Sequence, residues 1–135
     1  SHKKICPVTV KGLKRSLNVD GKKHRVFGIK DVKTAHCNGI LFKVTHEELD
    51  NLIEREKLYT MKPLAKSRIQ FNYKKCITFK PNDEVICFYP MKKYVLTKTN
   101  LDKKPINKNY LQICIEGSSK INKQFLDDFV KMTVI

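Results

Sequence analysis

The sequence predicts a single α+β domain of 135 residues. Three observations indicate this class: runs of strand length dominate the first two-thirds of the chain, one capped amphipathic helix interrupts them, and two amphipathic helices close the chain. A chain of this length buries roughly two-thirds of the surface that its unfolded form exposes, so it can hold one core without a metal or disulfides. We therefore expect one domain over residues 1–135, with a mixed sheet and three helices.

The first strands are predicted from extended apolar stretches and turn residues. Residues 5–19 have the pattern of an extended segment in which Gly12 allows a bulge or bend. The Asp-Gly pair at 20–21 is typical of a tight turn before a second strand at 24–29. Residues 40–44 form a nearly continuous apolar run, which predicts a central strand buried on both faces.

The clearest helix follows that strand. Thr45 and Glu48 have the spacing of a capping box, in which each residue's side chain accepts a hydrogen bond from the other's backbone. Val44 and Leu49 have the spacing of a hydrophobic staple across the same helix start. We expect the helix to run from about residue 46 to residue 57.

The remaining elements have weaker signals. Alternating polar and apolar residues predict a strand at 69–73, and apolar segments that flank a Lys-Pro-Asn-Asp turn predict a pair of strands. Helical spacing predicts two final helices, separated by Gly117 as a cap. The expected ranges are 76–79 and 84–89 for the paired strands, 94–96 for a further short strand, and 108–117 and 122–133 for the helices.

Basic residues outnumber acidic ones, and the formal net charge is +15. Most of the basic residues are lysines, and ten of the lysines stand in short pairs at predicted turns, such as 22–23, 74–75 and 92–93. Planar guanidinium groups are the usual readers of phosphates and bases, so scattered lysines predict only weak, non-specific binding of polyanions. No apolar run approaches the ~18 residues of a membrane span, and we expect no membrane partner.

The five cysteines are an odd number without Cys-x-x-Cys spacing, and the histidines are not spaced as paired metal ligands. His36 and Cys37 are adjacent, but neighbours on a strand point to opposite faces. We therefore expect no metal site and five free thiols in a cytoplasmic protein.

Glu56 breaks the apolar pattern of the predicted helix. It lies seven residues after Leu49, and seven steps of ~100° return it to the face that carries Leu52 and Ile53. Such a carboxylate is paired with a buried cation, reaches solvent from the fraying helix end, or works in a cleft. If it is enclosed, it becomes a candidate general acid or base. Glu54, by the same periodicity, faces outward.

The segment around this helix resembles a known family. Residues 38–59, which read Asn-Gly-Ile-Leu-Phe-Lys-Val, then the capped helix, then Glu-Lys-Leu-Tyr at 56–59, closely resemble the gamma-glutamylcyclotransferase-like family. There, a strand N-G-[VI]-[LV]-[FW]-x-[VI] leads into a helix that ends in Leu-Asp-x-x-Glu-Gly-x-Tyr. Residues 8–18 are similar to the family's strand after its opening loop, and 110–117 with 125–129 to its C-terminal helices. The resemblance covers most of the chain.

The resemblance implies a barrel-like sheet flanked by helices and a transferase or lyase reaction without a cofactor. In the family, the glutamate that matches Glu56 takes a proton from the alpha-amine of a small gamma-glutamyl substrate. The amine attacks its own gamma-carbonyl, closes a five-membered ring, and releases 5-oxoproline with an amine or amino acid. Because both reacting groups belong to one molecule, the enzyme supplies orientation and proton transfer. Tyr59 would line the substrate pocket; its alternative role is a core aromatic of a strand.

The chain departs from the family's pattern at three places. The family's opening strand and its Tyr-Gly-Ser-Leu loop, which holds the anionic end of the substrate, do not occur in residues 1–135. Ile53 stands where the family often has Asp, and Lys57 where it often has Gly. Two functions therefore remain: a gamma-glutamyl cyclotransferase, or a non-catalytic module of the same fold that binds a polyanion or protein through its basic surface. We expect the domain to lack its first strand within residues 1–135, and because an unpaired edge invites pairing, we expect that strand to lie outside this sequence or to come from another copy in a homo-oligomer.

Overall fold

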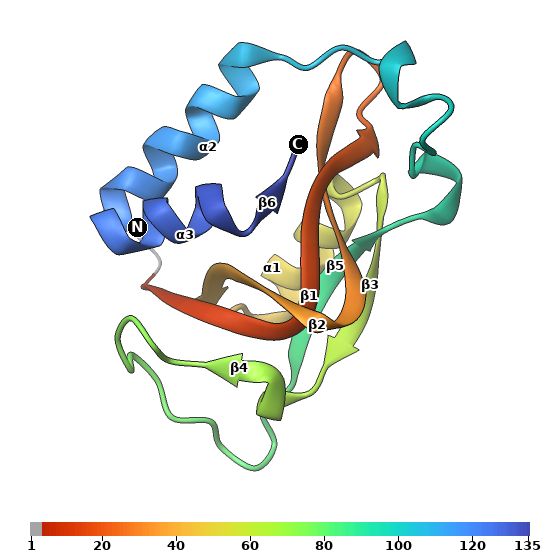
Figure 1. Cartoon of the computed structure of the whole chain (residues 1–135). Helices are drawn as coiled ribbons and strands as arrows, with labels where there is room; N and C mark the ends of the chain where they lie inside the picture. The colour runs from red at the N-terminus through yellow and green to blue at the C-terminus, as the bar shows by residue number, and fades with distance from the viewer. Residues whose placement is uncertain (1–3) are drawn as a thin grey trace.

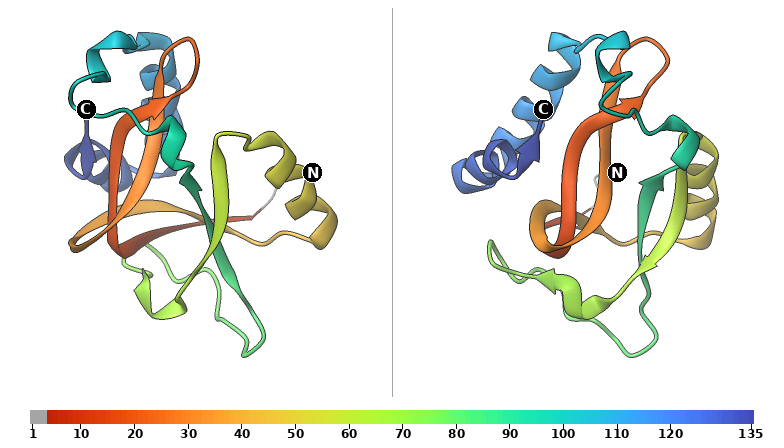
Figure 2. Two further views of the ribbon diagram at one scale, coloured as in Figure 1. Left: turned by 90° about the vertical axis from the view of Figure 1, so that its right-hand side faces the viewer. Right: turned by 45° about the vertical axis from the view of Figure 1, so that its right-hand side comes forward.

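The chain is built around one long β-hairpin. The computed structural model describes residues 4–135, and the hairpin of β1 and β2 runs between α2 and α3 on one side and β3, β5 and α1 on the other (Figure 1). Figure 2 shows the same arrangement from two further sides. The elements are β1 (Ile5–Asp20), β2 (Arg25–Phe42), α1 (His46–Arg55), β3 (Tyr59–Leu64), β4 (Ile69–Gln70), β5 (Val85–Pro90), α2 (Lys108–Ile121), α3 (Lys123–Lys131) and β6 (Thr133–Val134), with 3-10 helices η1 (Lys66–Arg68), η2 (Lys92–Tyr94) and η3 (Leu101–Lys103). The class is α+β, as the sequence predicts.

The strands form two sheets, and the described residues do not close them into a barrel. β1 pairs antiparallel with β2 and β4 and parallel with β6, whereas β3 and β5 form a separate antiparallel ribbon. β2 is an edge strand, so the expectation of a central strand at 40–44 is wrong. Ile40 and Phe42 on it are 37% and 41% exposed.

The hairpin bends at Gly12. This residue has a φ of +78°, in the left-handed region that favours glycine. The pairing register shifts there, and residues 32–35 of β2 have no partner on β1. Arg68 spans the bend: its Nε and Nη2 donate to the carbonyl oxygens of Lys11 and Gly12, each at 2.8 Å. The predicted bend is confirmed, and a charged side chain holds it.

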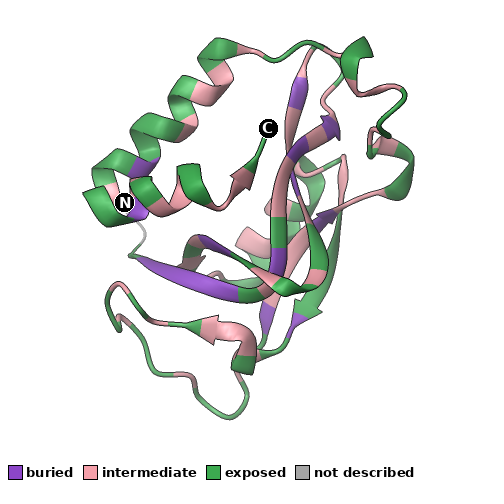
Figure 3. Cartoon of the chain, in the orientation of Figure 1, coloured by how far each residue is buried: buried purple, intermediate pink, exposed green. Residues whose placement is uncertain are grey.

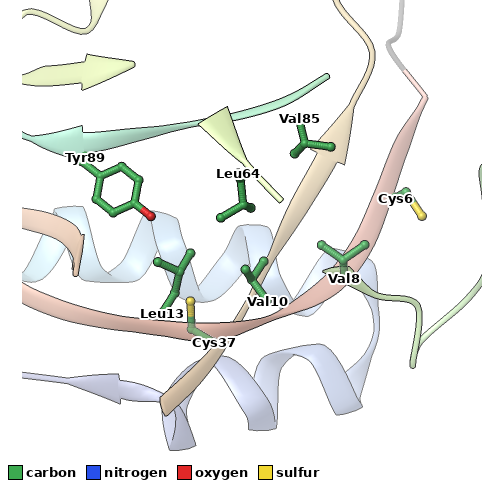
Figure 4. Packing of buried hydrophobic residues seen from close by; sticks show 8 residues of the cluster. All are labelled: Cys6, Val8, Val10, Leu13, Cys37, Leu64, Val85 and Tyr89. Atoms are coloured by element: carbon green, nitrogen blue, oxygen red, sulfur yellow. The ribbon is translucent and has the colours of Figure 1, made fainter. Parts of the chain in front are cut away.

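The hydrophobic core lies between the hairpin and the β3–β5 ribbon. Figure 4 shows side chains from the two layers pointing toward one another. Burial is concentrated on the hairpin and ribbon, while the helices are largely exposed (Figure 3). The buried cluster consists of Cys6, Val8, Val10, Leu13 and Cys37 from the hairpin and Leu64, Val85 and Tyr89 from the ribbon.

Arg15 joins the C-terminal segment to the hairpin. Its Nη1 and Nη2 donate to the backbone oxygen and Oδ1 of Asn38, at 2.6 and 2.7 Å. Its Nε donates to Thr133 Oγ1 at 2.9 Å, and its guanidinium lies 4.3 Å from the centre of the Phe129 ring. Asn38, only 2% exposed, donates in turn to the Phe125 carbonyl at 2.9 Å. Burial lowers the pKa of Arg15, and the hydrogen bonds compensate for its lost hydration.

Several element boundaries differ from the expected ones. α2 continues to Ile121 with Gly117 inside it, because Asn122 provides the break: its Oδ1 accepts the Phe125 N–H at 2.7 Å and caps α3. β4 is shorter than predicted, β3 was not predicted, and residues 76–79 form no strand. Residues 76–79 lie in a loop, where Cys76 and Phe79 pack against the core without pairing with another strand.

The expectation of five free thiols is wrong. Cys6 and Cys76 form a disulfide, which links the start of β1 to the loop after β4 across 70 residues of sequence. Cys37, Cys87 and Cys114 are free. The cysteine pattern therefore no longer supports a cytoplasmic location, which remains a prediction.

Thiol titration of the denatured, non-reduced chain should find the three free cysteines, and reduction should raise the count to five. Because the bridge closes a long loop, reduction should lower the free energy of unfolding by roughly 2–4 kcal/mol, measured by urea titration. A count of five before reduction would contradict the bridge.

Replacing Arg15 by Met should lower the free energy of unfolding by about 2–4 kcal/mol, because the buried oxygens that it serves lose their donors. Arg55→Met, on the exposed end of α1, is the matched control and should change stability by less than about 0.5 kcal/mol. Equal stability of the two variants in urea would show that Arg15 is not the connection proposed.

Candidate functional site

Helix α1 positions Glu56, which lies at its C-terminal end. The predicted capping box is confirmed: Thr45 Oγ1 accepts the Glu48 N–H at 3.2 Å, and Glu48 Oε1 accepts the Thr45 N–H at 2.9 Å. The helix ends at Arg55, two residues before the expected end. Glu56 is its C-cap, with its N–H donating to the Leu52 carbonyl at 2.9 Å.

The chain reverses directly after Glu56. The Glu56 carbonyl accepts the Tyr59 N–H at 3.1 Å, and Tyr59 begins β3. The Tyr59 hydroxyl then reaches across to the hairpin and donates to the Phe27 carbonyl at 2.6 Å. Tyr59 is thus half-buried between the two sheets, with its hydroxyl held in place.

A second tyrosine, Tyr110, also contacts Phe27 of the hairpin. The N–H of Phe27 donates to the Tyr110 hydroxyl oxygen at 3.0 Å, and the two rings are 5.6 Å apart between centres. The ring of His24 lies 5.3 Å from that of Tyr110. Both backbone polar groups of Phe27 are therefore satisfied by tyrosines that come from β3 and α2.

The charge of Glu56 contributes to a raised pKa of both Tyr59 and Tyr110. Burial is the main cause that raises the pKa of Tyr59, and the charges of Tyr110 and Glu56 raise it further. Burial likewise raises the pKa of Tyr110, again with a contribution from Glu56. The Glu56 carboxylate is itself half-buried and has no hydrogen bond or ion pair with another side chain of residues 4–135.

The face of α1 expected to carry Glu56 is only partly buried. Leu49, Leu52 and Glu56 are half-buried, but Ile53 is 43% exposed. Glu54 is exposed, as the helical periodicity predicts. Helix α1 therefore lies with one face toward the protein, although that face is only partly covered.

The pocket expected above Glu56 remains a prediction. Glu56 does not line either of two surface hollows found among the described residues. One, of about 290 Å³, lies against the same helix and is lined by Phe42, Val44, Glu48, Asn51, Leu52 and Arg55. It adjoins the uncovered edge of β2 that carries Ile40 and Phe42.

Two other expectations concern metals and membranes. Among residues 4–135, no group of three His, Cys, Asp or Glu side chains is placed to hold a metal ion. His36 is exposed and Cys37 is buried, so the adjacent pair does point to different surroundings; burial raises the pKa of the Cys37 thiol. Within the same part of the chain, none of the helices has both the length and the apolarity needed to cross a bilayer.

No protein-family model and no curated protein matches the chain at a significant level. The family resemblance of the sequence around Glu56 therefore remains a prediction.

The sequence singles out Glu56 and Tyr59, which the structure places close together, but not Phe27 or Tyr110. Phe27 acts through its backbone, which leaves no signal in the side-chain pattern. Tyr110 stands in the first turn of α2, after the cap Asn107, where an aromatic residue has no distinctive spacing. Only the packing of α2 against the hairpin brings it to this site.

Tyr59→Phe should lower the free energy of unfolding at neutral pH by about 1 kcal/mol, because the Phe27 carbonyl loses its donor. Since the folded-state pKa of Tyr59 is raised, its hydroxyl contributes stability that is full below the unfolded value of 10.0 and is lost as pH rises toward the folded value. The difference between wild type and variant should therefore shrink between pH 7 and pH ~11 in urea titrations. A difference that grows with pH would contradict the assigned direction.

Proposed function

We propose that this chain is a gamma-glutamylcyclotransferase-like domain that forms 5-oxoproline from a small gamma-glutamyl amine or peptide, with Glu56 as the proton carrier. The observation that carries the proposal is the position of Glu56: a half-buried carboxylate without an ion pair, at the end of a capped helix, whose charge reaches Tyr59 and Tyr110. The sequence pattern around that helix supports the same residue independently.

The reaction requires one proton carrier and a fixed orientation of the substrate's alpha-amine toward its gamma-carbonyl group. Glu56 would take a proton from the substrate's alpha-ammonium group, and the freed amine would attack the gamma-carbonyl carbon. The departing nitrogen would receive that proton from Glu56 as its bond to the carbon breaks. The ring nitrogen would then lose its second proton through Glu56 to the departing amine, which leaves as an ammonium ion. The products are 5-oxoproline and an amine. The ring closure is intramolecular, so holding the two ends of the gamma-glutamyl group close supplies most of the acceleration. The Tyr59 hydroxyl, already held by Phe27, would form one wall of the substrate site.

The uncovered edge of β2 supports the expectation of a further strand. Ile5 and Phe42 pair with each other at the open end of the hairpin and are 47% and 41% exposed, beside the partly covered face of α1. A strand of the kind that opens the family's fold would cover these side chains and bring its backbone N–H groups toward the site. Sequence outside residues 1–135 or a second copy of the chain would supply such a strand.

The test is release of 5-oxoproline from a panel of gamma-glutamyl amines and peptides by the full gene product. Glu56→Gln keeps the shape of the side chain and removes the base, so turnover should fall by roughly 100-fold or more with little change in stability. Glu54→Gln, two residues earlier and on the exposed face, should be nearly silent and is the matched control. Normal turnover by Glu56→Gln would overturn the catalytic role.

The second candidate is a non-catalytic module that binds a polyanion or a protein through its basic surface. Its support is the net charge of +15. Steeply salt-dependent binding of nucleic acid or heparin together with no turnover on the panel would favour it. Weak binding that disappears at physiological salt, alongside turnover, favours the cyclotransferase.

A further inference from the structure

Another surface hollow lies at the bend of the hairpin, and Glu56 is not among the residues that line it. It has a volume of about 420 Å³ and is lined by Lys14, Val32, Thr34, Ala35, His36, Lys131 and Met132. Such a volume is in the range of small-molecule sites. The stretch of β2 that has no partner on β1 supplies one wall, and the end of α3 supplies the other.

Strand pairing places two lysines that are distant in sequence at this hollow. Arg15 pairs with Thr133 where β6 lies parallel to β1, and this pairing brings the end of α3 beside the hairpin. Lys14 and Lys131 therefore line the same hollow, although more than a hundred residues of sequence separate them. The position of Lys131 is further fixed by Met132, which caps α3 and packs against the core cluster.

The cationic groups of the hollow have no internal partners. Among residues 4–135, the side chains of Lys14, His36 and Lys131 form no hydrogen bond and no ion pair. No Asp or Glu lines the hollow. By contrast, Lys104 is paired with Asp20, and Arg68 with Asp31. The hollow thus holds two uncompensated positive charges and an imidazole beside an apolar floor of Val32, Ala35 and Met132.

We propose that this hollow binds a phosphate monoester with a small ring or alkyl body. A phosphate monoester carries nearly two negative charges at neutral pH, which matches the two ammonium groups, and its oxygens accept hydrogen bonds from Lys and His. The apolar floor would cover the organic body of the ligand, which inorganic phosphate lacks. This site is separate from the proposed cyclotransferase site and does not depend on its activity.

The test uses phenyl phosphate as the probe, followed by amide and methyl NMR of the full chain at about 0.15 M salt. We expect saturable shifts at Val32, Thr34 and Met132, and weaker binding of inorganic phosphate at the same positions. Lys14→Gln with Lys131→Gln should weaken binding of phenyl phosphate at least about 10-fold, because each ammonium group donates a charge-assisted hydrogen bond.

The matched control is Lys98→Gln with Lys108→Gln, which lowers the net charge equally at two exposed lysines outside the hollow. It should change the affinity less than about 2-fold. Equal weakening in both double variants would show general attraction to a basic surface and overturn the site. Absence of saturable shifts at about 10 mM phenyl phosphate would also overturn it, as would equally tight binding of inorganic phosphate.

Discussion

The hydrogen bonds of the Arg15 guanidinium are the interactions on which the position of the C-terminal helices depends. It binds oxygens of β2, α3 and β6 from the middle of β1, so four elements meet at one side chain. Few residues of the two C-terminal helices are fully buried: α2 has only Ser118 and α3 only Phe125, although the Phe125 and Phe129 rings contact Tyr73 and Phe27. Helices with so little buried surface need directional contacts, and a planar group with five N–H donors provides several at once.

The candidate site depends on the same attachment. Tyr110 reaches Phe27 only because α2 lies against the hairpin, and α2 is joined to α3, which Arg15 holds. Arg25 adds a second connection by donating to the carbonyl oxygens of Leu101 and Lys104 just before α2. The surroundings of Glu56 are therefore assembled from parts that are distant in sequence, and the hairpin is their common support.

Local signals in the sequence were sufficient for the parts of the fold that local chemistry determines. The capping box at Thr45 and Glu48, the bend at Gly12 and the outward position of Glu54 follow from spacing within a few residues. The edge position of β2 could not be predicted, because an apolar run looks the same whether or not a neighbouring strand covers it. Likewise, the Cys6–Cys76 bridge depends on where a loop returns in space, and the pairing of Tyr59 and Tyr110 on Phe27 on how two elements dock. Glu56 itself could be singled out because a charge on an apolar face is a local anomaly.

The distribution of charge bears on the choice between the two functions. Of the four arginines, Arg15, Arg25 and Arg68 donate to backbone carbonyl groups of the protein, so the groups best suited to read phosphates are engaged internally. Apart from Arg55, the exposed positive charge comes from lysines, which bind polyanions with little geometric preference. In a chain with 28 basic residues, a half-buried carboxylate would be expected to acquire an ion pair, yet Glu56 has none among the described residues. Because Glu56 is partly exposed at the C-cap of α1, water can hydrate its carboxylate, and the absence of an ion pair leaves its oxygens free for the ligand that we propose.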